Sequence, residues 1–125
     1  VEIQGHTYDM HQWQDYEQGV ARETISMLEG ESEEDYIAVF RNDFEIFQKK
    51  LEANTESQVF AFSYPRGEYN TLAAVLLNEA GVTVTLTTEP GTNTVIKGLP
   101  QSLLGLHRYG VNGNMSAAEL LDLIS

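Results

Sequence analysis

The stretch from Val59 to Asn70, V-F-A-F-S-Y-P-R-G-E-Y-N, carries the strongest structural signals in the chain. Its first six residues are a short apolar run rich in aromatic side chains, which is typical of a buried strand. Pro65-Arg66-Gly67 ends that run as a turn. Asn70 can cap a helix, because its side-chain oxygen can accept a backbone N–H of the first helical turn. The stretch therefore predicts a strand, a turn and a helix in succession.

Strands and helices alternate on both sides of this stretch. Ser32 opens a preceding helix, and the helix after Asn70 ends at Gly81. Residues 82–88 and 103–111 predict two further strands, and the capping box at residues 116–119 opens a last helix. The first helix carries one apolar stripe, which is expected to pack in the core: Tyr36, Phe40, Phe44, Phe47 and Leu51. Alternation with short connections predicts an α/β fold with a parallel sheet.

The amino-terminal part is less regular. Residues 1–3 are interpreted as the end of a strand, and residues 12–30 as a long functional loop with at most one helical turn. In α/β folds, ligand sites gather at the carboxyl ends of the strands. Because residues 5–11 and 64–67 both follow predicted strands, we expect them to lie on the same rim of the sheet.

Composition limits the possible partners. The 125 residues fit one domain, and a hydrophobic content of 42% indicates a folded chain. The net charge of −12 makes nucleic acids and anionic membrane surfaces poor partners. The sequence has no run of 18 apolar residues, so no membrane span is predicted. No signal peptide is visible, and because the chain does not begin with Met, we expect it to be a processed or excised piece. The absence of cysteine excludes thiolate metal sites and disulfides, and leaves the compartment open.

Two of the three histidines, His6 and His11, lie in the segment G-H-T-Y-D-M-H. On a regular helix, five positions turn two side chains about 140° apart, so a shared site needs an irregular turn. The pair could be metal ligands or two solvated loop residues, and the spacing alone favours the second, because two histidines are too few to close a metal site. Asp9 could be a third ligand, but we expect it to hold the loop by accepting backbone N–H groups.

Other polar and aromatic residues have simpler interpretations. The acidic residues at the start of the first helix are expected to be solvated capping groups rather than acid/base catalysts: Glu31, Glu33 and Glu34. Three aromatic side chains could stack on sugar rings, but the sequence supports packing in the core or at the rim equally well: Tyr8, Trp13 and Tyr64.

The motifs H-T-Y-D-M-H, G-E-S-E-E-D-Y, F-S-Y-P-R-G-E-Y-N, T-L-T-T-E-P-G and L-H-R-Y-G-V-N-G occur in this order. Together they resemble the later half of a polysaccharide deacetylase domain, the NodB-homology type of carbohydrate esterase family four. The resemblance covers nearly the whole chain and is most specific at residues 6–11 and 62–70. It implies that residues 1–125 are a partial deacetylase domain, the later part of a (β/α) barrel.

The resemblance implies that His6 and His11 bind a divalent metal, most often zinc. Most members of the family space these histidines four positions apart, and the poly-N-acetylglucosamine deacetylase branch uses the five-residue step found here. Thr7 resembles the residue that steadies the loop between the ligands. The family's Asp-Asp motif, which supplies the base and the third ligand, has no counterpart in these residues. This chain alone is therefore expected to bind zinc weakly and to be inactive.

The turn after residue 63 resembles the family's R-P-P-Y-G motif, with Ser63 at the Arg position and Arg66 at the Tyr position. The resemblance implies that the backbone N–H of Arg66 holds the oxyanion, a role that survives a change of side chain. The Arg that usually pairs with the catalytic acid is missing at Ser63. His107, in L-H-R, is expected to be a structural or surface residue rather than the general acid. The residues expected to contact substrate are Tyr64, Pro65 and Gly67.

The resemblance implies a fragment of a metal-dependent deacetylase that acts on N-acetylglucosamine-containing polymers, either exopolysaccharide or peptidoglycan, outside the cell or at the bacterial cell surface. The alternative is a non-catalytic carbohydrate-binding or interaction domain that keeps the deacetylase fold. In both cases the missing strands predict an exposed sheet edge, through which the chain could form homo-oligomers.

Overall fold

The computed structural model describes residues 2–13 and 21–125. Its helices are α1 (Glu33–Asn54), α2 (Thr71–Glu79) and α3 (Ala117–Ile124), and its strands are β1 (Ala61–Ser63) and β2 (Val84–Leu86). Short 3₁₀ turns cover Pro65–Gly67 and Pro100–Leu103. The predicted α/β organisation with parallel strands is confirmed. None of the helices in the described ranges is both long and apolar enough to cross a membrane.

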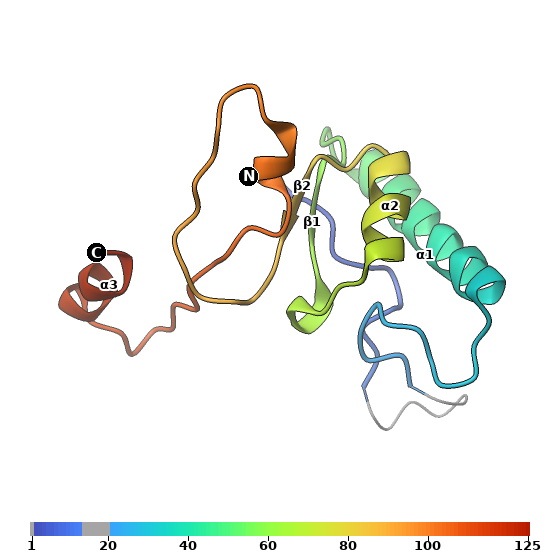
Figure 1. The fold of residues 1–125 in the computed structure, drawn as a ribbon, viewed down its shortest axis with the longest axis horizontal. Coiled ribbons are helices and arrows are strands. Elements are labelled where there is room, and N and C mark those ends of the chain that lie inside the picture. Colours follow the sequence, from blue (N-terminus) through green and yellow to red (C-terminus); the bar gives the residue numbers. More distant parts are fainter. Residues whose placement is uncertain (1, 14–20) are drawn as a thin grey trace.

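Four chain segments run side by side in the sheet. β1 pairs with β2 in parallel, with Phe62 opposite Thr85. Isolated parallel bridges add Gly5 beside Phe62 and Leu106 beside Leu86. The order across the sheet is therefore residue 5, β1, β2 and residue 106, and α1 and α2 lie together on one side of it (Figure 1).

The core forms between α1, α2 and the strands. Ser32 caps α1 by accepting the N–H of Asp35, which confirms the predicted start of the helix. The predicted stripe is also confirmed, since Tyr36, Phe40 and Phe44 are buried and the later members are half-buried. They pack with residues of the strands and α2: Phe62, Leu76, Leu77 and Val82. Each such side chain contributes about 1.5–3 kcal/mol by leaving water.

The caps of the later helices also agree with the predictions. The Oδ1 atom of Asn70 accepts the N–H of Ala73 at 2.7 Å, which starts α2. Ser116 and Glu119 form both halves of the capping box of α3. However, α3 has no buried residue and lies apart from the other helices, at the end of an extended stretch (Figure 1).

Two predicted strands differ from the structure. Pairing near the amino terminus occurs at Gly5, not at residues 2–3, and Val1 is outside the described residues. Gly5 lies so close to β1 that a Cβ atom there would be 2.8 Å from the carbonyl oxygen of Ala61. The predicted strand over residues 103–111 is wrong: Leu104 N–H donates to Gln101 in the 3₁₀ turn, so ladder pairing begins only at Leu106.

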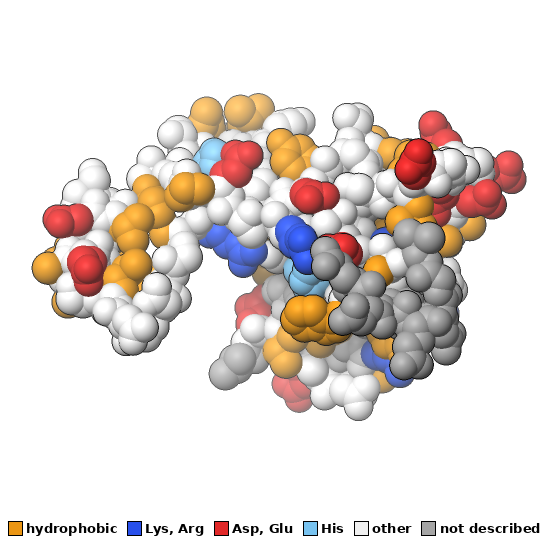
Figure 2. Space-filling view, turned by 90° about the horizontal axis from the view of Figure 1, so that it is seen from below, with side chains coloured by type: hydrophobic (Ala, Val, Ile, Leu, Met, Phe, Trp, Pro, Cys, Tyr) orange, Lys and Arg blue, Asp and Glu red, His pale blue; other side chains and the backbone are white. Residues whose placement is uncertain are grey.

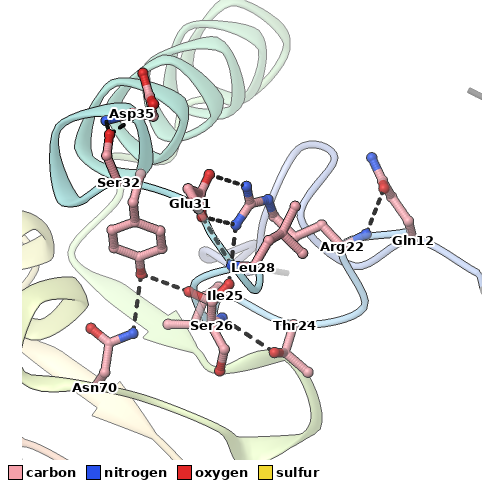
Figure 3. Close-up of polar contacts among 11 residues, drawn as sticks. Gln12, Arg22, Thr24, Ile25, Ser26, Leu28, Glu31, Ser32, Asp35 and Asn70 are labelled. Atoms are coloured by element: carbon pink, nitrogen blue, oxygen red, sulfur yellow. Dashed lines mark hydrogen bonds and ion pairs between the residues drawn. The ribbon is translucent and has the colours of Figure 1, made fainter. Parts of the chain in front are cut away.

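The segment before α1 is anchored by a polar network (Figure 3). The Arg22 guanidinium donates to both carboxylate oxygens of Glu31 and to the carbonyl of Ser26, and both charged side chains are about nine-tenths buried. The Tyr36 hydroxyl donates to the carbonyl of Ile25 at 2.6 Å. The interpretation of Glu31 as a solvated cap is therefore wrong, because a partner from the preceding loop covers it. Residues 21–30 of the predicted loop contain no helix, and residues 14–20 are outside the described residues.

Candidate metal and oxyanion site

The two segments expected on one rim of the sheet do line one cavity. His6 follows the Gly5 bridge, Ser63 ends β1 and Arg66 follows it, and Arg108 follows the Leu106 bridge. These residues and His11 surround a cavity of about 580 Å³. Figure 2 shows Lys or Arg side chains next to a histidine near the middle of one face.

The two histidine rings lie close together, and their hydrogen bonds indicate the tautomer that a metal ligand needs. Their ring centroids are 5.2 Å apart and the rings are nearly perpendicular, at 85°. The Nδ1 of His6 lies 2.6 Å from the carbonyl oxygen of Ser63, and the Nδ1 of His11 lies 2.7 Å from that of Glu23. Because a carbonyl oxygen can only accept, each Nδ1 carries a proton, and in the neutral ring it is Nε2 that keeps the lone pair. This is the tautomer in which neutral imidazole binds a metal through Nε2.

The loop between the histidines is held by a residue that the sequence did not suggest. The carboxylate of Asp43, on α1, accepts the backbone N–H groups of Tyr8 at 2.9 Å and Asp9 at 2.6 Å. Burial raises the pKa of the Asp43 carboxyl, and the two N–H donors oppose that rise. Asp9 was expected to hold the loop in this way, but among the described residues its own carboxylate accepts only the Gln12 amide, at 3.2 Å. That expectation is wrong, because the acceptor comes from the helix behind the loop.

The available donors fit part of a divalent metal site. Imidazole nitrogen is a good ligand for zinc and neighbouring transition metals. Among residues 2–13 and 21–125, no group of three His, Cys, Asp or Glu side chains is close enough to hold a metal ion. A catalytic zinc site uses three protein ligands and an open position. His6 and His11 therefore supply two of the ligands that such a site needs.

The turn after β1 places Arg66 at the cavity. Arg66 has φ 55° and ψ 9°, and it is the only residue other than glycine with positive φ in the described ranges. Its N–H donates no hydrogen bond to another described residue, while the next N–H, of Gly67, donates to Tyr64. The Arg66 guanidinium pairs with Glu23 at 2.8 Å. Glu23 therefore contacts both parts of the site, His11 through its carbonyl and Arg66 through its carboxylate.

The residues expected to bind substrate lie next to the cavity but do not line it. Tyr64 and Pro65 are buried, and the Tyr64 ring stacks on Tyr69 with centroids 5.2 Å apart. Gly67 packs closely against Thr88. Their contact with substrate stays a prediction. The hydroxyl of Ser63, which stands where the family has Arg, is buried and has no partner among the described residues.

The remaining aromatic and histidine candidates differ in exposure. Trp13 is exposed, and Tyr8 is half-exposed with the Lys50 ammonium 5.4 Å from its ring centroid. His107 is half-buried against Gly91, and its backbone N–H donates to the Asn93 side chain. The His107 side chain does not line the cavity. The expectation that His107 is a structural or surface residue stays a prediction.

Comparison of the sequence with family models and with curated proteins finds no match. Solved structures do match. The Streptococcus pyogenes deacetylase PplD in complex with acetate superposes with a TM-score of 0.62 at 23% identity, over 81% of this chain and 41% of that one. A de-N-acetylase from Aggregatibacter actinomycetemcomitans superposes with a TM-score of 0.58 at 15% identity, over 74% of this chain and 34% of that one. The chain spans less than half the length of either protein, and over that part it shares the fold of these two deacetylases.

Proposed function

We propose that these residues are the later part of a metal-dependent deacetylase that removes N-acetyl groups from N-acetylglucosamine-containing polymers. One observation carries the proposal. His6, His11 and Arg66 line the same cavity, both histidines have Nδ1 at a carbonyl oxygen, and the N–H of Arg66 lacks a partner among the described residues. The fold shared with bacterial de-N-acetylases supports it.

The residues present account for binding and for charge stabilisation. His6 and His11 would hold a divalent cation, zinc in our proposal, which when bound supplies a Lewis acid for the acetamide carbonyl and lowers the pKa of the attacking water. The N–H of Arg66 donates to the oxygen that becomes negative as the carbonyl carbon turns tetrahedral. A carboxylate from the preceding part of the fold takes the proton of the water. Acetate leaves, and a free amine remains on the sugar.

The test is metal-dependent acetate release from N-acetylglucosamine oligomers by a complete deacetylase domain that contains these residues. We expect His6→Ala or His11→Ala to lower the release by at least about 100-fold, because each removes a metal ligand. His107→Ala is the matched control and should keep the activity, since that ring does not line the cavity. No release with zinc, cobalt or nickel would overturn the proposal.

The chain by itself should bind zinc weakly and release no acetate. It supplies two imidazole ligands and, within its described ranges, no third. Isothermal titration with zinc, together with an acetate assay on the isolated chain, checks both parts. A tight site, or an active isolated chain, would show that a ligand or base within this chain has been missed.

A second candidate is a carbohydrate-binding or interaction domain without catalysis. Ser63 in place of the family's Arg, and the lack of a third ligand among the described residues, favour it. This domain would bind exopolysaccharide or peptidoglycan oligomers at the cell surface without metal, which NMR titration in the presence of EDTA can measure. The two candidates also differ in the preceding strand of the domain, where a pair of adjacent aspartates indicates the enzyme and their absence indicates the binding domain.

A further inference from the structure

We propose that Asp43 is a positioning residue that fixes the loop carrying His6 and His11 in its ligand-binding shape. The inference rests on the proposed metal-binding role of the two histidines, and it extends the site to helix α1. The carboxylate of Asp43 lies 34 and 35 residues along the chain from the two backbone groups that it accepts.

Both oxygens of the carboxylate are used, each by one of two consecutive N–H groups. Oδ2 accepts from Tyr8 and Oδ1 accepts from Asp9, and Asp43 is only 7% exposed. Consecutive N–H groups converge on one anion only when the backbone between them is curved into a concave nest. Hydrogen bonds to an ionised carboxylate are also shorter and stronger than neutral ones. Asp43 therefore imposes one backbone shape on the centre of the loop.

The imposed shape explains how a five-residue step can bring two imidazoles together. Tyr8 is two residues after His6, and Asp9 is two residues before His11, so the clamp lies midway between them. Met10 is buried in the core, at 2% exposed. The centre of the loop is thus tied to the body of the protein, while the two rings meet at 5.2 Å over the cavity.

The clamp needs a carboxylate in particular. Two N–H donors converge on it, and an Asn side chain would offer one acceptor oxygen and direct its own NH₂ group at the second donor. A residue chosen only for packing, beside Phe44 on the buried face of α1, would be apolar. The Asp43→Asn variant therefore removes one of the two acceptor oxygens while the side-chain volume stays almost the same.

The first readout is the imidazole NMR spectrum of the metal-free chain. Hydrogen-bonded Nδ1–H signals of His6 and His11 are expected in the wild type, and D43N should weaken or lose them as the rings leave their carbonyl partners. Ser32→Ala is the matched control, because it removes the cap of the same helix without touching the loop. It should lower stability and keep both signals. Unchanged signals in D43N, or equal losses in D43N and S32A, would overturn the proposal.

The second readout is zinc affinity by isothermal titration of a complete deacetylase domain that contains these residues, because the isolated chain supplies only two ligands. D43N should weaken the zinc Kd by about 10- to 100-fold, as loss of a residue that orients metal ligands usually does, and S32A should leave it unchanged. If the complete domain binds no zinc while D43N still loses the Nδ1–H signals, the proposed metal function fails and the positioning role stands. If D43N does not fold, amide exchange in the wild type decides: the N–H groups of Tyr8 and Asp9 should be protected like those of α1, and fast exchange would overturn the proposal.

Discussion

Arg66 and Gly67 show how much of the candidate site depends on backbone shape. Arg66 has positive φ, and the next residue, Gly67, has φ 77° and lies against Thr88. This pair of left-handed residues turns the chain directly after β1 and leaves the Arg66 N–H free of partners among the described residues. The proposed oxyanion role therefore depends on the conformation of the turn more than on the Arg66 side chain.

Gly67→Ala should destabilise the protein by at least about 2 kcal/mol, because φ is positive and there is no room for a side chain. A Cβ atom at this position would lie 2.7 Å from the backbone nitrogen of Thr88. Gly81→Ala is the control, since Gly81 also has positive φ (94°) but a Cβ there would meet nothing within 4 Å. It should cost only about 1 kcal/mol. Urea unfolding measures the free energy of unfolding of both variants. Equal losses of stability in the two would contradict the steric argument.

The buried pair Arg22–Glu31 makes stability depend on pH. The hydrogen bond from Arg22 holds the pKa of Glu31 below its ordinary value of 4.5, so the pair stabilises the fold above that pH and the contribution is lost as pH falls below it. Glu31→Gln should cost roughly 3 kcal/mol near neutral pH, and the difference from wild type should shrink on acidification. Unfolding curves of wild type and E31Q, recorded from neutral pH to below pH 4.5, measure this difference in stability.

Glu45→Gln is the matched control for the Glu31 experiment. Glu45 also pairs with a basic residue, Lys49, but both side chains are exposed to solvent. An exposed pair of this kind contributes little, so this variant should unfold like the wild type at every pH. A difference between wild type and E31Q that is constant with pH would show that the charge of Glu31 is not what stabilises the loop.

At the scale of the elements, α2 and α3 begin in the same way but differ in what holds them. Both have a side-chain cap, at Asn70 and Ser116. α2 buries Ala73, Leu76 and Leu77, whereas α3 buries none of its residues. A helix that packs on nothing depends on its own propensity and caps, and short isolated helices are only marginally stable in water.

The two caps should therefore respond differently to mutation. Asn70→Ala should cost about 1 kcal/mol or more of global stability, because the side chain caps α2 and its amide also donates to the Tyr36 hydroxyl. Ser116→Ala should reduce the helical circular dichroism of the chain without shifting the unfolding midpoint. A shifted midpoint in S116A would mean that α3 packs against the body of the protein.

At the scale of the whole molecule, both edges of the sheet lack a further partner strand among residues 2–13 and 21–125. Gly5 and Leu106 are the outermost bridged residues in the described part of the chain. Parallel sheets of α/β proteins are normally covered on both faces and extended by further strands. Exposed strand edges offer free N–H and C=O groups to another chain.

We expect the isolated chain to self-associate through the edge of the sheet at Gly5. Sedimentation should give a mass above the 14.0 kDa of one chain. Ile3→Lys, at a half-exposed position beside the Gly5 bridge, should shift the population towards monomer, because an edge lysine opposes strand pairing. Val75→Lys, at an equally exposed position on α2, is the control and should leave the mass unchanged. A wild-type chain that is strictly monomeric would contradict the prediction.

Short-range sequence patterns predicted most of the helices and strands, and they predicted that the histidine segment and the turn after β1 lie on one rim of the sheet. Caps at Ser32, Asn70 and Ser116, the aromatic stripe of α1, and the strand and turn around Pro65 were all readable, because each depends on residues within a few positions of one another. The third strand was overestimated, because apolar residues after Pro100 resemble a strand whether or not a partner is available for them.

The contacts that shape the site were not readable, because their partners are far apart in the chain. Asp43 looks like any polar residue of a helix until the fold brings the histidine loop against it. Glu23 and Glu31 look like solvated acids until Arg66 and Arg22 reach them. Local sequence therefore placed the histidines on a loop after a strand. Only packing between distant segments set the tautomer of each ring, the shape of the loop and the distance between the two imidazoles, because the carbonyl and carboxylate groups that hold them belong to residues 12 to 57 positions away.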